Sequence, residues 1–211
     1  MKYCGKIKAE IIDDLHSLDP SDFYDMYFKT DEVWYFNNQL PNKKSPEEYL
    51  QIVSAIISDH FEISKDSYLI VGSAKIGFSL SPKKNFRGFG VPSRNFGQSD
   101  LDIAIISDSL FNELWEAFKD LTYRTFVNNY PIISSSIFKG YLNDKYIYNQ
   151  LTLESDLKEK MDKCNISMQD DIGILEPVNY RFYSSWEDLE KYTKSGINKC
   201  KDEGEKIGIQ I

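Results

Sequence analysis

The chain has 211 residues, of which 41% are hydrophobic and 14% aromatic. This is enough apolar material for one sizeable domain, or a domain with a small appendage, and it argues against a disordered chain. No stretch approaches the roughly 18 apolar residues that a bilayer span requires, and no signal-peptide run follows the start. We therefore expect a cytoplasmic protein with no membrane partner. The cysteines at positions 4, 164 and 200 are widely spaced, which indicates neither a disulfide framework nor a zinc site.

The formal net charge of −8 argues against nonspecific binding of nucleic acid over the whole surface, so any phosphate site has to be local. One segment stands out because no acidic residue occurs between Asp66 and Asp100, while five basic ones do: Lys75, Lys83, Lys84, Arg87 and Arg94. The basic loop 83–94 is therefore a candidate contact for nucleic acid or phosphate, with Phe86, Phe89 and Phe96 as stacking surfaces. A solvated surface loop without a binding role explains this run of basic residues equally well.

In chain order, residues 1–44 form an N-terminal extension without a clear period, and the domain proper spans 45–211. Ser45, Pro46 and Glu48 are typical of a capped helix start, and apolar residues then recur at helical spacing to about His60. Residues 67–71 are expected to form a buried strand that ends on Gly72-Ser73, followed by a long loop over 74–98.

A second apolar strand is predicted over 101–106, and a helix opens at Asp108. We expect helices to dominate an insertion around 108–168, followed by a turn at 170–173. Residues 177–183 alternate as a strand does, and a last helix starts near Ser185 and fades after Cys200.

Two short motifs carry chemistry. Gly72-Ser73 closes one strand, and Asp100-x-Asp102 opens the next. Side chains alternate along a strand, so the two carboxylates project from one face while Leu101 and Ile103 enter the core. Paired carboxylates suit a magnesium ion that also binds substrate phosphates. Either motif alone is more often a plain turn or a helix cap, and the signal lies in their combination.

This order of helix, strand, Gly-Ser, loop, strand with Asp-x-Asp and helix resembles the DNA polymerase beta-type nucleotidyltransferase superfamily over residues 45–120. The resemblance implies an α/β (α+β type) fold with a nucleotidyltransferase-like mixed β-sheet flanked by helices and a helical C-terminal part. It also implies that Asp100 and Asp102 hold Mg²⁺ or Mn²⁺, and that Gly72 and Ser73, with Lys75 beside them, position a nucleoside triphosphate.

Two features depart from the family pattern. Gly72 and Asp100 lie 28 positions apart, where the family has a short turn and helix. The family also places a third carboxylate on a later strand, yet residues 178–183 contain no acid. Glu176 is the best candidate for the third catalytic carboxylate and Asp171 the next, whereas Arg181 at that position would compete with a second metal ion.

The sequence thus predicts transfer of a nucleotidyl group from a nucleoside triphosphate to a hydroxyl acceptor, with magnesium as the cofactor. The alternative is a catalytically weak or inactive nucleotidyltransferase-like subunit that binds a partner protein or nucleic acid. An antiviral defence or toxin–antitoxin setting is suggested only by how often small members of the family occur there.

Overall fold

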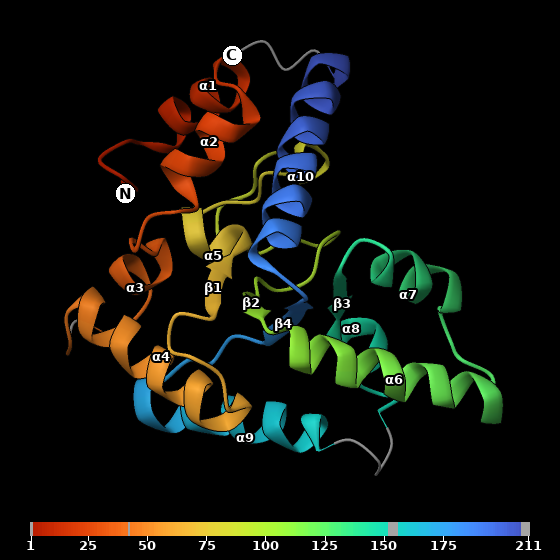
Figure 1. The fold of residues 1–211 in the computed structure, drawn as a ribbon. Coiled ribbons are helices and arrows are strands. Elements are labelled where there is room, and N and C mark those ends of the chain that lie inside the picture. The colour runs from red at the N-terminus through yellow and green to blue at the C-terminus, as the bar shows by residue number, and fades with distance from the viewer. Residues whose placement is uncertain (1, 42, 152–155, 208–211) are drawn as a thin grey trace.

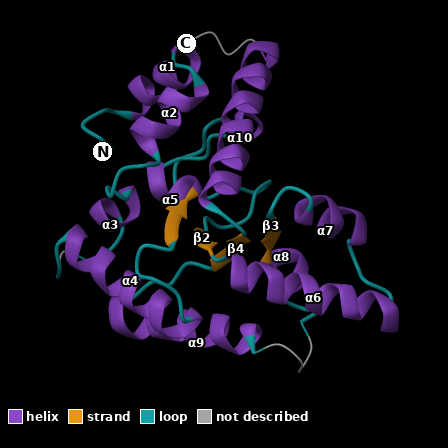
Figure 2. Cartoon of the chain, in the orientation of Figure 1, coloured by secondary structure: helices purple, strands orange, loops and turns teal. Residues whose placement is uncertain are grey.

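The computed structural model describes residues 2–41, 43–151 and 156–207. Helices surround one small sheet in the described part of the chain (Figures 1 and 2). The elements are, in order, α1 Lys8–Ser17, α2 Pro20–Tyr27, α3 Trp34–Asn38, α4 Pro46–Phe61, β1 Tyr68–Val71, α5 Gly72–Ile76, a 3₁₀ turn at Pro82–Lys84, β2 Leu101–Ile106, α6 Asp108–Arg124, α7 Tyr130–Ile137, β3 Tyr141–Asn143, α8 Asp144–Ile147, α9 Leu157–Ile172, β4 Val178–Tyr183 and α10 Trp186–Ile207. The fold is therefore mixed α/β, as the sequence predicts at this level.

The sheet has the strand order β1-β2-β4-β3. Strand β2 is central: it pairs antiparallel with β1, Val71 opposite Asp102, and parallel with β4, Asp102 opposite Asn179. Strand β3 closes the far edge antiparallel to β4. The sheet is mixed, with β1 and β3 at its edges.

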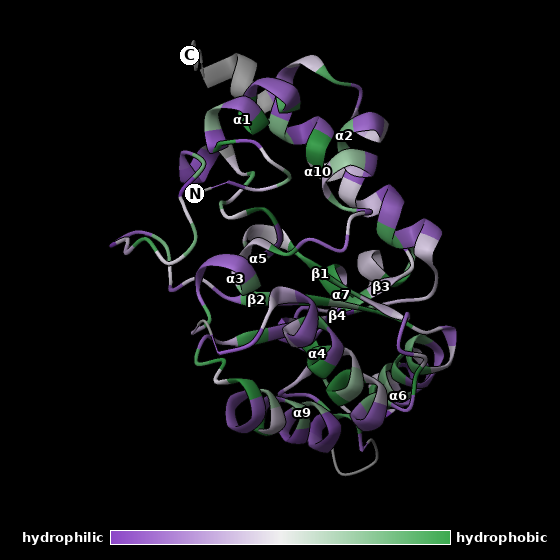
Figure 3. Ribbon diagram, turned by 90° about the vertical axis from the view of Figure 1, so that its left-hand side faces the viewer, coloured by the Kyte–Doolittle hydropathy of each residue, from purple (hydrophilic) through white to green (hydrophobic). Residues whose placement is uncertain are grey.

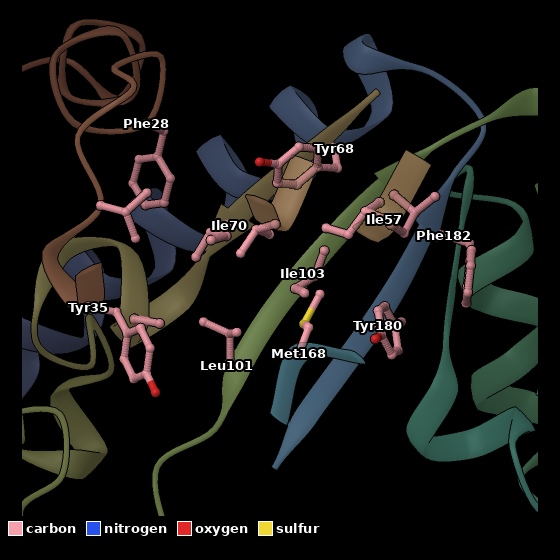
Figure 4. Packing of buried hydrophobic residues seen from close by; sticks show 14 of the residues in the cluster. Phe28, Tyr35, Ile57, Tyr68, Ile70, Leu101, Ile103, Met168, Tyr180 and Phe182 are labelled. Atoms are coloured by element: carbon pink, nitrogen blue, oxygen red, sulfur yellow. The ribbon is translucent and has the colours of Figure 1, made fainter. Parts of the chain in front are cut away.

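The central strand β2 is covered on both faces. On one face, β2 contributes Leu101, Ile103 and Ile105 to the main core, where they meet Met168 of α9 and Ile57 of α4 (Figure 4). On the other face a smaller cluster forms under α10, made of Val71, Ala104, Ile106, Tyr183 and Leu189. Helices α4 and α9 thus cover one face and α10 the other, which explains the nearly continuous apolar sequence of β2.

The N-terminal residues belong to the same core. Segment 1–44, expected as an extension without clear elements, forms α1 to α3, and its rings pack on one another and on Phe89 of the long loop, with Phe23 beside Tyr27 and Tyr35 beside Phe89. The main core takes residues from Tyr3 to Ile197, and Figure 3 shows strongly hydrophobic stretches of the ribbon in the sheet and in α4. Among the described residues, no helix is both long enough and apolar enough to cross a bilayer.

Several predicted elements are confirmed. Ser45 caps α4 with the expected capping box to Glu48, and strands β1, β2 and β4 start within a residue or two of their predicted positions. The region 108–168 differs, because a short strand, β3, runs between α7 and α8. The turn expected at 170–173 is also wrong: α9 continues to Ile172, and only Gly173 adopts the left-handed conformation that ends it.

The central strand gives the first prediction. Ile103 is fully buried at the middle of β2, so Ile103→Ala should lower the free energy of unfolding by about 2–5 kcal/mol through lost burial and a residual cavity. Leu175→Ala, at a side chain 76% exposed, should change it by less than about 0.5 kcal/mol. Urea denaturation of both variants checks this, and equal effects would contradict the assignment of β2 as the core strand.

Candidate functional site

The two aspartates of the Asp-x-Asp motif lie at the start of β2. Asp102 is the second residue of the strand, and Asp100 stands just before it, both half-buried. The amide of Asn179, on the neighbouring strand β4, donates to Oδ2 of Asp100 at 2.6 Å. Asn179 lies directly opposite Asp102 in the register of β2 and β4. The structure therefore brings both predicted carboxylates to one end of the sheet.

Gly72 brings the main chain up against this site. It follows β1 directly, has a positive φ of 67°, and a Cβ built on it would lie 2.5 Å from Oδ2 of Asp102. Only glycine fits there, because any side chain would both collide with the carboxylate and strain the backbone. Gly72 is exposed and Ser73 half-buried, so this stretch of main chain is open to solvent beside Asp102.

Lys75 lies away from the carboxylates. It is 1% exposed, and its Nζ donates to the carbonyl of Thr30, 2.5 Å away. Burial lowers the pKa of its amine to about 8, and nearby anionic groups oppose that shift. The buried ammonium group of Lys75 thus links α5 to the N-terminal segment through a hydrogen bond. It was expected to contact a triphosphate beside Gly72 and Asp102.

Glu176 is not brought to the site either. Its Oε2 accepts a short hydrogen bond from the hydroxyl of Tyr35, which belongs to α3. Asp171, the second candidate, is exposed near the end of α9. Among the described residues neither acid forms a metal-holding group with Asp100 and Asp102, and the catalytic role of Glu176 stays a prediction.

A third carboxylate that sequence reasoning missed lies near the pair. Asp144 begins α8 directly after β3, is 8% exposed, and accepts the backbone N–H of Tyr180 at 2.8 Å. Its other oxygen, Oδ1, is buried without a hydrogen-bond partner. The only available signal was the sequence Asn143-Asp144-Lys145, which looks like an ordinary helix start within a region predicted to be helical.

Arg181 supplies the positive charge in this cluster. It lies on β4 opposite Ala104, two residues beyond Asn179, and its guanidinium packs 4.6 Å from the ring centre of Tyr192 on α10. Its Nε is buried without a partner. Because an arginine side chain stays protonated, this face of the sheet holds one permanent cation among the carboxylates.

Burial raises the pKa values of two of these acids, Asp102 and Asp144, well above their ordinary range. Burial raises the pKa of Asp102 to about 6, with Asp100 adding to the shift and Arg181 opposing it. Burial likewise raises the pKa of Asp144 to about 6, while the N–H groups of Tyr180 and Lys145 and the cation of Arg181 act in the opposite direction. The excess negative charge is thus costly without a further cation or protons.

The donor set suits a divalent cation. Carboxylate oxygens of Asp100 and Asp102, and the unpartnered Oδ1 of Asp144, are the hard oxygen ligands that Mg²⁺ and Mn²⁺ prefer. However, within residues 2–41, 43–151 and 156–207 no three acidic, histidine or cysteine side chains are arranged closely enough to hold a metal ion together. Two carboxylates would leave most of the coordination of a magnesium ion to water and to the oxygens of a substrate.

Contacts within the protein occupy the aromatic rings and several of the basic side chains of the loop 83–94. Phe86 and Phe89 are buried in the core, so their rings are unavailable for stacking on bases. Arg87 donates to the carbonyls of Phe96 and Gly97, and its guanidinium lies over the ring of Phe96. Lys84 also lies over that ring. The loop 83–94 therefore presents charge but lacks the aromatic platform expected for it.

Comparison with known proteins finds no matching family model, no matching curated protein and no matching solved structure. Function has to be argued from the site itself.

The pKa values give a second prediction. Between about pH 4 and pH 6 the folded protein holds protons on Asp102 and Asp144 that the unfolded chain has released, so the free energy of unfolding falls as pH rises through that window. Asp102→Asn/Asp144→Asn should flatten this decline. At pH 7 the free energy of unfolding of the double variant should exceed that of the wild type by at most about 6 kcal/mol, because two pKa values are each raised by about 2 and one pKa unit corresponds to about 1.4 kcal/mol.

Urea denaturation in the presence of a chelator, at half-unit pH steps, measures this effect. Asp170→Asn/Asp171→Asn, which changes two exposed aspartates at the end of α9, serves as the control and should keep the wild-type slope. An unaltered decline between pH 4 and 6 in the Asp102/Asp144 variant would contradict the buried-carboxylate interpretation.

Proposed function

We propose that the protein is a nucleotidyltransferase-like domain that binds a nucleoside triphosphate with a divalent cation at Gly72, Ser73, Asp100 and Asp102, and transfers a nucleotidyl group to a hydroxyl acceptor. One observation carries the proposal: the exposed main chain at Gly72 lies against the carboxylate of Asp102, with space for no side chain. A turn that only reversed the chain would not need this close approach to a half-buried acid.

The chain's own groups have definable roles in such a site. The absence of a side chain at Gly72 allows phosphate oxygens to approach the backbone, and the hydroxyl of Ser73 is a donor for them. Asn179 fixes the orientation of Asp100 through Oδ2, leaving Oδ1 for another ligand. Asp102, with its pKa near 6, is largely ionised at neutral pH and would lose affinity for a cation in mild acid.

A bound divalent cation would supply neutralisation of the phosphate charge and orientation of the triphosphate. Asp100 and Asp102 are the residues that would hold it. The arrangement of Asp144, close enough to influence both aspartates electrostatically, adds negative charge that favours cation entry.

A second function is favoured by a specific observation. Strand β4 carries Asn179 and Arg181 on the face of the carboxylates, and no acid. A permanent cation in this position reduces the affinity for a second metal ion. The alternative proposal is therefore a nucleotide-binding subunit without transfer activity, which acts through a protein or nucleic-acid partner.

A double substitution tests metal and nucleotide binding. Asp100→Ala/Asp102→Ala should weaken magnesium-dependent binding of nucleoside triphosphate by at least 100-fold, because both proposed cation ligands are lost. Isothermal titration calorimetry with each of the four ribonucleotides, with magnesium or with chelator, measures it. Asp170→Ala/Asp171→Ala removes the same charge from an exposed helix end and should bind as the wild type does. Binding that survives in the first variant, or that needs no metal, overturns the proposal.

The same proteins separate transfer from binding. Incubation with labelled nucleoside triphosphate and magnesium or manganese, with and without RNA, should release pyrophosphate and label an acceptor if the site turns over. Metal-dependent binding without either product would favour the alternative. Glu176→Gln should leave both readouts unchanged, since the side chain of Glu176 accepts a hydrogen bond from Tyr35 and forms no metal-holding group with Asp100 and Asp102.

Gly72→Ala tests the close approach itself. The added methyl group would lie against Asp102 in a backbone conformation that alanine adopts poorly, so nucleotide affinity should fall by at least tenfold. Gly196→Ala is a matched control, because a Cβ there meets no atom within 4 Å. Circular dichroism verifies that both variants fold. A folded Gly72→Ala protein with wild-type affinity would contradict the role given to this glycine.

A further inference from the structure

A second opening lies on the free side of β1. This cleft has a volume of about 900 Å³ and contains none of the carboxylates discussed above. Three consecutive strand residues line it, namely Tyr68, Leu69 and Ile70. Because consecutive side chains point to opposite faces of a strand, a cleft that touches all three borders the strand's edge and not one of its faces.

The main-chain groups at this edge are directed into the cleft. Strand β1 is an edge strand that pairs only with β2. The N–H of Ile106 donates to the carbonyl of Ser67, and this fixes the alternation of the antiparallel ladder: Leu69 and Val71 exchange hydrogen bonds with β2, while Tyr68 and Ile70 face the other way. The described structure records no backbone partner for the amides or carbonyls of Tyr68 and Ile70. An edge of this kind is a template for another strand.

Two walls rise on either side of that edge. Leu50 and Ser54 of α4 form one wall, on the side where Tyr68 and Ile70 enter the main core. Tyr24 of α2, with Trp186 at the start of α10, forms part of the other wall, on the side of Leu69. Successive side chains of an added strand would point in turn to the wall of Leu50 and Ser54 and to the aromatic wall of Tyr24 and Trp186.

The charges of the cleft argue against a polyanion. Lys29 and Lys65 line it together with Asp31, Asp66 and Glu190. Lys29 is paired with Asp25, and Lys75 with the carbonyl of Thr30. A nucleic acid needs a surplus of free cations, whereas a peptide backbone needs donors and acceptors in strand spacing. The unpaired edge supplies the latter.

We propose that this cleft binds an extended peptide segment of a partner protein, which adds to the sheet as a strand beside β1 and pairs with the main-chain groups of Tyr68 and Ile70. The aromatic wall selects apolar side chains at alternate positions of the ligand. The proposal does not depend on nucleotide binding at Gly72 and Asp102, since the cleft and the carboxylates share no residue.

Selection from a displayed library of random ten-residue peptides supplies the probe. The selected peptides are synthesised and added to the full chain, and hydrogen exchange is followed at single amides by NMR. Exchange at Tyr68 and Ile70 should slow by at least tenfold, while that at Leu69 and Val71, already bonded to β2, should change little. N-methylation of every second peptide amide should weaken binding by at least tenfold in one register and little in the other.

A substitution in the wall separates this cleft from other surfaces. Gln51→Trp places a bulky ring at the exposed margin of the α4 wall and should weaken peptide binding by at least tenfold. Lys163→Trp, on the exposed surface of α9, is the control and should bind as the wild type does.

Four results would overturn the proposal: a library that yields no binder, binders that tolerate N-methylation in both registers, binding that leaves the exchange of Tyr68 and Ile70 unchanged, or a small molecule that binds the cleft and is displaced by no peptide. Loss of nucleotide binding in Asp100→Ala/Asp102→Ala should leave peptide binding intact, so the two proposals fail separately.

Discussion

The pairing of β2 with strands on both sides is the constraint on which the rest of the structure depends. Alternation along this one strand sends Leu101, Ile103 and Ile105 into the main core and leaves Asp102 and Ala104 on the face under α10. A slip of one residue in either ladder would bury the carboxylate among Met168 and the other apolar side chains and expose the core set. The hydrophobic pattern that folds the domain therefore also fixes the position of its acidic pair. No further helix or strand is needed to position Asp100 and Asp102.

The face under α10 concentrates charge that the fold has to neutralise. Asp100, Asp102 and Asp144 meet one arginine, so the cluster is negative by two when all are ionised. Burial raises the pKa values of two of these acids because water is largely removed from them, and Asn179 and Arg181 offset only part of that cost. A bound cation would relieve the remainder. The arrangement that would favour a cation therefore lowers the stability of the fold without one, and such perturbed pKa values cluster at functional sites.

The sequence predicted correctly those elements whose conformation is determined by a few neighbouring residues. The capping box at Ser45 and the strands 101–106 and 178–183 are each encoded in a few adjacent residues, and the structure has them, whereas the loop expected from residue 74 onward begins with the short helix α5. Strand β3 was missed because three residues between two helices carry no period, and their strand conformation exists only through pairing with β4. Asp144 was missed with it. The positions of Glu176 and Lys75 were also beyond the sequence, since each is tied to the N-terminal segment, through Tyr35 and Thr30, by contacts across more than 40 residues of chain.

Strand β1 connects the two proposed sites. On its inner edge, Val71 pairs with Asp102 of β2, and Gly72 follows the strand and lies against the Asp102 carboxylate. On its outer edge, Tyr68 and Ile70 line the cleft. An edge strand of only four residues is weakly restrained, because its hydrogen bonds to the sheet lie on one side only. A third partner on the free edge would restrict the same backbone that positions Gly72. If a nucleotide binds at Gly72 as proposed, occupation of the cleft would lower the entropy that is lost on ordering the start of α5, which would give positive coupling without a change in shape. By reciprocity, a bound nucleotide would strengthen the binding of the added strand by the same factor.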